Sequence, residues 1–178
     1  MCSSDLSGRM SDDARLALDL DAIHQLKARY CRFIDTKQWD RLPSLFTADA
    51  RFQGLGSAPT GATVEMFVAG ISTRLAKVVS IHHCHMPEIN FLTPDRARGI
   101  WAMVDYLEWP EGSGPHEAEG FRGFTGYGHY EEEYRRTPDG WRIAFLRLTR
   151  MRIDPLAQPA PRSARVLLPH APDWLLGA

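Results

Sequence analysis

The spacing of the apolar residues changes once along this chain, close to Ser80. Before that point they recur every three or four residues, as on one face of a helix. After it, apolar and polar residues alternate, as in strands. Helices followed by a run of strands predict an α+β fold and argue against alternating β-α-β units. We expect three N-terminal helices packed on a strongly curved, mostly antiparallel sheet, with a pocket enclosed between them.

The helical part of the pattern predicts three segments. The first runs from Leu16 to Ile34 and should end near the turn "DTKQW". A shorter stripe over 39–46 predicts a second helix, provided that Pro43 lies in its first turn. After a short strand that ends in glycines, 59–79 predicts a long third helix.

The strand part predicts two hairpins joined by a long polar loop. The turns "TPDR" and "TPDG" each separate two alternating stretches, which is a hairpin signal. The Gly-rich loop "EGSGPHEAEGFRG" lies between the hairpins, and loops of this kind often rim a binding site.

The chain has 178 residues, which suits one globular domain with a sizeable core. We expect this domain over 11–154, between a polar leader at 1–10 and a Pro-rich tail at 155–178. The leader lacks the apolar core of a signal peptide, and Met10 is a candidate native start. A net charge of −1 gives no electrostatic footprint for nucleic acid, and no apolar run is long enough to span a bilayer. Three cysteines without framework spacing fit a reducing cytoplasm.

The stretch "SIHHCHMPEI" holds three histidines and one cysteine in four consecutive positions. Successive side chains of a strand point to opposite faces, so His82 and Cys84 share one face while His83 and His85 share the other. A zinc site needs three or four protein ligands, and no second cluster at ligand spacing stands out, so we expect no metal. Two interpretations stay open: a strand with a solvated polar face, and one histidine that faces a pocket.

Asp35 stands where the first helix should end, which disfavours a carboxylate because this is the negative end of the helix dipole. One interpretation is an exposed turn residue, since Asp is common in turns. The other is a carboxylate that orients an imidazole and stabilises its protonated form.

Asp105 interrupts an otherwise apolar strand and shares its parity with Trp101, Met103 and Leu107. A buried aspartate must be paired or protonated, and a protonated acid is a good donor in an apolar pocket. The alternative is a strand edge or a bulge that turns it outward. Tyr30 lies on the apolar stripe of the first helix, where a tyrosine is more often core than catalyst, although a buried hydroxyl still needs a partner.

Three consecutive glutamates in the third long strand have several arginines as candidate partners on the sheet. Cross-strand charge pairing is the expected explanation. The glutamates are Glu131, Glu132 and Glu133, and the arginines are Arg135, Arg136, Arg147 and Arg150.

Three stretches together resemble the SnoaL-like family of the nuclear-transport-factor-2-like superfamily: "AIHQLKARYCRFIDTKQWDRLPSLFTADA", "SIHHCHMPEI" and "IWAMVDYLEW". The resemblance covers the chain from Leu20 to Asp154 and implies a cone-shaped barrel. Within the superfamily these stretches are most similar to cofactor-free dehydratases such as bile-acid 7α-dehydratase and, more distantly, scytalone dehydratase. Such enzymes use an aspartate at the end of the first helix and a histidine on the strand after the third helix.

The resemblance implies four catalytic residues in this chain: a histidine base, an aspartate that orients it, and two donors to substrate oxygens. In that order they are His82, Asp35, Tyr30 and Asp105. If a bulge shifts the strand register, His83 takes the place of the base. The chain departs from its relatives at Ile34, where scytalone dehydratase has a tyrosine, and near Gly54, where the bile-acid enzyme has another pocket tyrosine.

The implied reaction removes a proton next to a carbonyl or similar group and then expels water or another leaving group. No metal, nucleotide or flavin cofactor is implied. The substrate would be a hydrophobic, ring-containing molecule of steroid, terpenoid or aromatic type. We expect its binding residues to be Trp39, Phe52, Trp101, Met103 and His83.

Alternatives to a lyase stay open. Isomerisation begins with the same proton abstraction, and the fold also serves as a non-catalytic ligand carrier, as an assembly domain or as the small subunit of ring-hydroxylating dioxygenases. The enzyme hypothesis requires Asp35 and His82 to meet within hydrogen-bond reach in a mostly apolar cavity. The resemblance further implies a homo-oligomer, a trimer ahead of a dimer. The charge and the cysteines predict a cytoplasmic protein without a nucleic-acid or membrane partner.

Overall fold

A computed structural model describes residues 12–115, 120–157, 171 and 174–176. The expected leader at 1–10 and most of the expected tail at 155–178 lie outside the described residues. The chain forms the elements α1 (Asp12–Asp35), η1 (Leu42–Leu45), β1 (Phe46–Gln53), α2 (Val64–Leu75), β2 (Val79–Thr93), β3 (Arg96–Glu108), β4 (Gly123–Thr137), β5 (Gly140–Leu156) and η3 (Trp174–Leu176). Helices thus precede the long strands, and the α+β expectation is confirmed.

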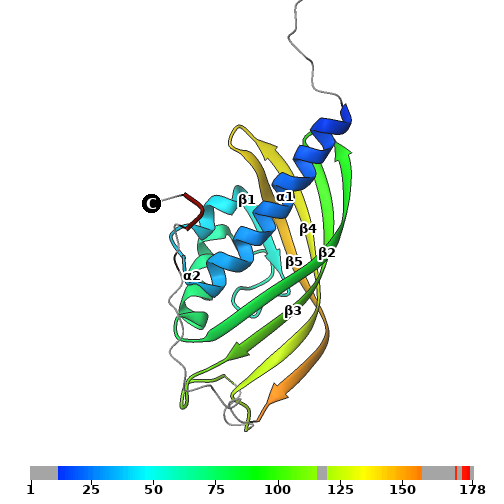
Figure 1. Cartoon of the computed structure of the whole chain (residues 1–178). Helices are drawn as coiled ribbons and strands as arrows, with labels where there is room; N and C mark the ends of the chain where they lie inside the picture. Colours follow the sequence, from blue (N-terminus) through cyan, green and yellow to red (C-terminus); the bar gives the residue numbers. More distant parts are fainter. Residues whose placement is uncertain (1–11, 116–119, 158–170, 172–173, 177–178) are drawn as a thin grey trace, which may run out of the picture.

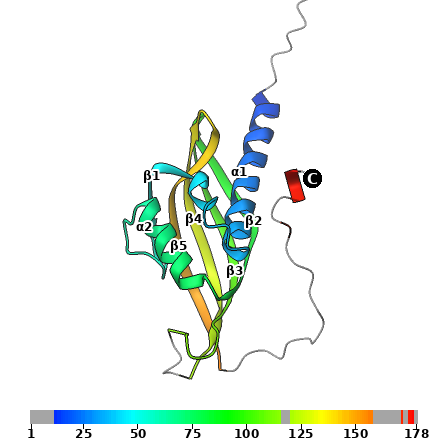
Figure 2. The same cartoon turned by 90° about the vertical axis from the view of Figure 1, so that its left-hand side faces the viewer.

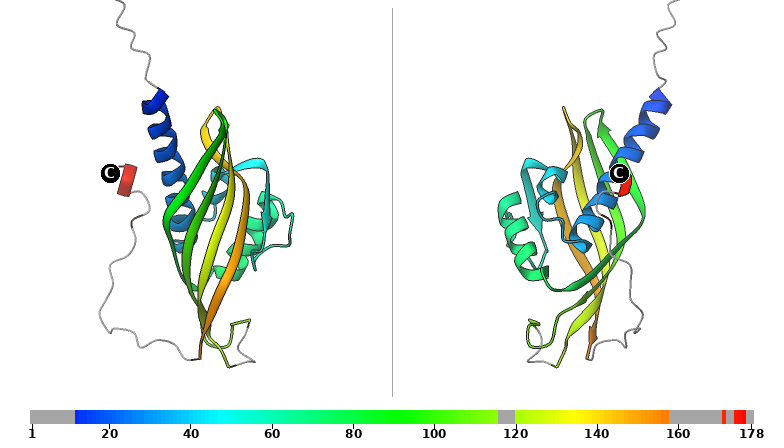
Figure 3. Two further views of the ribbon diagram at one scale, coloured as in Figure 1. Left: turned by 90° about the vertical axis from the view of Figure 1, so that its right-hand side faces the viewer. Right: turned by 60° about the vertical axis from the view of Figure 1, so that its left-hand side comes forward.

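The strands form one curved sheet in the order β1-β5-β4-β3-β2. The pairs β2–β3, β3–β4 and β4–β5 are antiparallel, while β1 runs parallel to β5. Both α-helices lie on the same side of the sheet, with α1 running diagonally across it (Figures 1 and 2). The other side of the sheet faces away from them (Figure 3). The inner side of the curved sheet is therefore the side on which a pocket can form.

The expectation of three N-terminal helices is wrong, because the described residues contain two α-helices. The stripe at 39–46 forms only the 3-10 turn η1, in which Pro43 occupies the first turn, and the chain enters β1 at Phe46. Apolar residues then alternate along β1, where Phe46, Ala50 and Phe52 are buried. A segment of four residues between a turn and a strand leaves no room for an α-helix.

Helix α1 ends where the sequence pattern placed its end, and its geometry fixes Asp35. The backbone N–H of Lys37 donates to Ile34 and that of Gln38 to Phe33, which is the hydrogen-bond pattern of a Schellman motif. Lys37 takes the left-handed conformation that this motif requires, with φ of 61°. Asp35 is consequently the last helical residue, and its side chain projects from a rigidly closed helix end.

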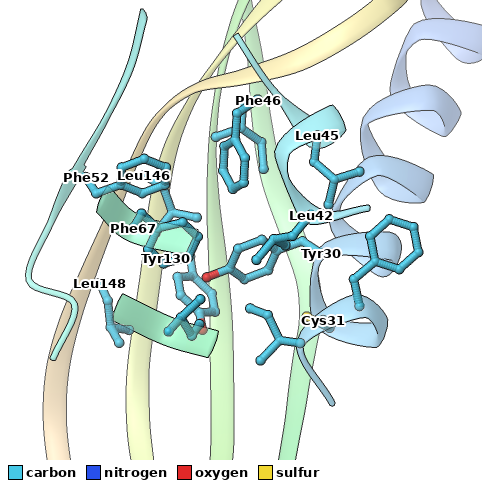
Figure 4. Close-up of a cluster of buried hydrophobic side chains, with 14 of the residues drawn as sticks. Tyr30, Cys31, Leu42, Leu45, Phe46, Phe52, Phe67, Tyr130, Leu146 and Leu148 are labelled. Carbon is cyan, nitrogen blue, oxygen red and sulfur yellow. The ribbon is translucent and has the colours of Figure 1, made fainter. Parts of the chain in front are cut away.

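Helix α2 begins at Thr63, whose side chain accepts a hydrogen bond from the backbone N–H of Met66. Its buried face, at i, i+3, i+4 spacing, packs over β1 and completes an aromatic core with α1 (Figure 4). In that core Phe52 stacks on Phe67, with ring centroids 4.2 Å apart. Neither described helix is both long and apolar enough to cross a membrane.

Candidate active site

His82 and Asp35 are in direct contact, as expected from the sequence. The Nδ1 atom of His82 lies 2.6 Å from Oδ1 of Asp35, and the backbone N–H of His82 donates to Oδ2 of the same carboxylate at 2.8 Å. With Nδ1–H donating to the carboxylate, Nε2 keeps the lone pair and is the ring nitrogen that can accept a proton. The side chain of His82 is 7% exposed and that of Asp35 is 21% exposed, so the pair is shielded from bulk solvent.

A second link ties the end of α1 to the start of β2. The Nζ atom of Lys37 donates to Oγ of Ser80 at 2.7 Å, two residues before His82 on the same strand. Burial lowers the pKa of Lys37, and the nearby negative charge of Asp35 partly opposes this effect. Three hydrogen bonds, two between Asp35 and His82 and one between Lys37 and Ser80, therefore hold the helix end to the strand and fix the orientation of the imidazole.

His82 lines a cavity of about 280 Å³ between α2 and the inner face of the sheet. Its polar lining includes His82, Tyr30, Tyr130, Asp105 and Arg150. Much of the remaining wall is apolar, with contributions from Ile71, Leu75, Leu107, Phe124 and Leu148. A few converging polar groups in an otherwise apolar cavity are typical of a small-molecule site.

Asp105 is buried, as expected, but it is paired with Arg150 and not free to donate. The guanidinium makes a two-pronged contact, Nη1 to Oδ1 at 2.5 Å and Nη2 to Oδ2 at 2.6 Å. Burial by itself lowers the pKa of Arg150, but the hydrogen bonds and charge of Asp105 outweigh this and hold the pKa above its ordinary value. Arg150 is therefore a cationic donor at the cavity, and Asp105 keeps it charged and oriented.

Tyr30 reaches the cavity from α1, and its hydroxyl points toward Tyr130 on β4 (Figure 4). The two rings meet edge to face with centroids 5.8 Å apart, and their side chains are hydrogen-bonded. Burial raises the pKa of both phenols well above their ordinary value. Both hydroxyls are therefore neutral donors over the whole physiological pH range.

Beneath the tyrosines lies a buried ion pair that the sequence pattern did not predict. Lys27 pairs with Glu132, and its Nζ atom lies 3.5 Å from the ring centroid of Tyr130. Tyr134 also donates to Glu132, and Nε1 of Trp101 donates to the Tyr134 hydroxyl at 2.7 Å. Lys27 lies on the buried stripe of α1, one turn before Tyr30. A lysine at a buried position needs a partner, and this is the feature of the sequence that could have predicted the ion pair.

The five expected binding residues lie elsewhere. Phe52 and Met103 belong to the core, Trp39 is half-buried against it, and Trp101 and His83 line an outer groove between α1 and β2. The reason is the path of α1: it covers the first half of β3, where Trp101 contacts His24, while the second half of β3 stays open to the cavity. His83 points away from His82 and is exposed, as strand alternation requires.

The strand charges pair differently from the expectation. Only Glu131 pairs with one of the predicted arginines, Arg147. Glu133 instead pairs with Arg98, and Glu132 with Lys27. The described residues contain no group of three or more His, Cys, Asp or Glu side chains arranged to hold a metal ion.

Residues 15–147 match the SnoaL-like domain family. The chain is also 31% identical to "Probable cyclase FGR4" of Gibberella zeae over 139 residues, which covers 72% of this chain and 89% of that protein.

Solved structures with the same fold share little sequence with this chain. A type-2 hexachlorocyclohexane dehydrochlorinase superposes with a TM-score of 0.70 at 20% identity, covering 87% of this chain and 100% of the other. A protein provisionally named scytalone dehydratase, from Novosphingobium aromaticivorans, superposes with a TM-score of 0.68 at 16% identity, covering 87% and 99%. At these identities the likeness concerns the fold alone.

Proposed function

The chain belongs to the SnoaL-like domain family of the nuclear-transport-factor-2-like superfamily, and on that premise we propose that it is a small-molecule lyase in which His82 removes a proton from carbon. The observation that carries this proposal is the contact between Asp35 and His82 at the wall of a largely apolar cavity. A structural histidine needs neither a fixed tautomer nor a cavity beside it.

Proton removal falls to Nε2 of His82, because Nδ1–H is held by Asp35. As the imidazole becomes imidazolium, the carboxylate stabilises the new positive charge without taking the proton itself. The proton comes from a carbon next to a carbonyl or similar activating group, because such a group makes the C–H bond acidic enough for an imidazole base. The partial exclusion of water strengthens the interaction between the two charges.

The negative charge that develops on the carbonyl oxygen needs donors, and the cavity provides them. Arg150 contributes a guanidinium whose orientation Asp105 fixes, and Tyr30 contributes a neutral hydroxyl. Donors that are already oriented before the reaction lower the barrier without reorganising. Expulsion of a leaving group from the neighbouring carbon then completes an elimination.

The relatives' names support chemistry of this type. One relative is named as a cyclase, and the structural neighbours are named as a dehydrochlorinase and a scytalone dehydratase. Loss of hydrogen chloride, loss of water and ring closure by a carbon nucleophile each include removal of a proton from carbon. Isomerisation shares this first step and is the alternative outcome at the same site.

The test uses cyclic β-hydroxy ketones, because loss of water gives a conjugated enone that is followed by its ultraviolet absorbance. The wild-type protein should convert at least one member of a panel whose rings fit a cavity of about 280 Å³. His82→Ala should lower the rate by about a hundredfold or more, the usual contribution of a general base. His83→Ala is the matched control, because that ring is exposed and points away, and its rate should stay at the wild-type value.

Equal rates for wild type and His82→Ala would contradict the proposal and favour a binding module. Loss of activity in His83→Ala alone would assign the base to the neighbouring histidine.

A further inference from the structure

A second hollow of about 740 Å³ adjoins the cavity and shares three of its lining residues. It lies between α2 and the connection that follows β3, and its wall includes the indole of Trp109. Gly56, Ser57 and Arg74 line both spaces, so the side chain of Arg74 stands at the boundary between them.

The position of Arg74 follows from close packing one helical turn earlier. A Cβ atom on Gly70 would lie 1.8 Å from the backbone oxygen of Ser57, so only glycine lets α2 approach the preceding segment this closely. Arg74 is four residues further along and therefore lies on the same face of the helix. A Cβ atom added to Gly56 would lie 3.7 Å from Nη2 of Arg74, and the guanidinium carbon of Arg74 is 5.5 Å from the ring centroid of Trp109.

The charge of Arg74 is not balanced within the part of the chain that the structure describes. No described carboxylate forms an ion pair with it, and burial lowers its pKa. Among the described residues that line either space, Asp105 is the one acid, and both of its oxygens are engaged by Arg150. The helix dipole favours a cation in the last turn of α2 and so explains the charge at this position. It does not explain why the guanidinium lies beside the Trp109 ring at the wall of a hollow.

We propose that Arg74 is an anion subsite that binds a carboxylate carried by the ring-containing ligand of this cavity. The planar guanidinium matches a carboxylate through two parallel N–H···O bonds, and the Trp109 ring lies beside it. This proposal rests on the proposed function in one respect: the reacting carbon of the same ligand is taken to lie near His82. Binding of the carboxylate itself requires no turnover.

The experiment compares 2-naphthoate with 2-naphthamide, which share a flat ring system and differ in charge, by calorimetric or NMR titration of the full chain. The wild-type protein should bind the carboxylate about tenfold or more tightly than the amide, because charged hydrogen bonds replace neutral ones. Arg74→Gln should abolish this preference. Arg74→Lys should keep part of it, because the ammonium retains the charge but loses the two-pronged geometry.

Arg29→Gln is the matched control, since it removes the same charge from an exposed position on α1 and should leave the preference intact. Equal binding of the two probes by the wild type, undetectable binding of naphthoate, or equal losses in Arg29→Gln and Arg74→Gln would each overturn the subsite.

His82→Ala separates this proposal from the proposed function. It should keep the naphthoate preference while losing turnover. If it instead kept turnover while Arg74→Gln still lost the preference, the function of His82 would be wrong and the subsite would stand.

Discussion

Gly126 on β4 lies directly opposite Asp105 on β3, and a side chain at this glycine would collide with the ion pair that Asp105 makes with Arg150. A Cβ atom there would sit 1.9 Å from Nη1 of Arg150 and 2.3 Å from Oδ1 of Asp105. The guanidinium starts on β5 and crosses β4 to reach β3, and the missing side chain of Gly126 is what allows this crossing.

Gly126→Ala is therefore expected to separate Arg150 from Asp105. Activity should fall by about tenfold or more, because the guanidinium is then no longer held in the orientation in which it donates to the substrate. Gly123→Ala is the matched control on β4, because its Cβ atom would clash with the backbone of Leu107 and Glu108 and has neither Arg150 nor Asp105 among its nearest atoms. Thermal melting should show both variants destabilised, while the activity of the folded fraction should fall only in Gly126→Ala. Equal activity losses would mean that general damage to β4 explains the effect.

Arg150→Gln should destabilise the protein by about 3 kcal/mol, because it leaves the buried carboxylate of Asp105 without its partner. Adding Asp105→Asn to this variant should restore part of the stability, since no buried charge then remains unpaired. Denaturant unfolding measures both values. Activity should stay low in both, because neither variant has the guanidinium of Arg150. A double variant less stable than Arg150→Gln would argue against a direct ion pair.

Tyr30→Phe should lower activity by about tenfold, because it removes one neutral donor and leaves the ring in place. Since burial raises the pKa of Tyr30, its hydroxyl stays protonated below its ordinary pKa of 10 and titrates only at higher pH. The pH–rate profiles of wild type and variant should then have the same shape up to about pH 10. Tyr106→Phe, whose hydroxyl bonds to Glu108 outside the cavity, serves as the control. An alkaline limb below pH 10 that disappears in Tyr30→Phe would contradict this assignment.

Much of the fold could be predicted because apolar spacing reports directly on local structure. The two hairpin turns and the end of α1 at Asp35 were found in this way. The helix predicted at 39–46 was wrong, because that stripe fits either a helix or the start of a strand. The pairing of β1 with β5, which the local pattern does not reveal, decides between them.

The site could be predicted where its residues lie on one element or match a known motif, and not where they meet across strands. His82 and its contact with Asp35 were expected from the family resemblance, and alternation explains why His83 lies on the other face of the strand. Arg150 on β5 was expected to pair with the glutamates of the adjacent strand β4. Its partner is Asp105 on β3, one strand beyond β4. The overlooked signal was the pair of glycines in "TGYGHY", since glycine inside a strand often marks a close approach.

The central claim is that Asp35 and His82 act as one catalytic unit, and a double-mutant cycle on the elimination rate tests it most directly. His82→Ala removes the base, and Asp35→Asn leaves it in the wrong tautomer, so each alone should cost about a hundredfold or more. Because either change disables the same unit, the double variant should be little slower than the slower single variant. Losses that multiply in the double variant would mean that the two residues act independently, and the assignment of a catalytic Asp35–His82 pair would be wrong.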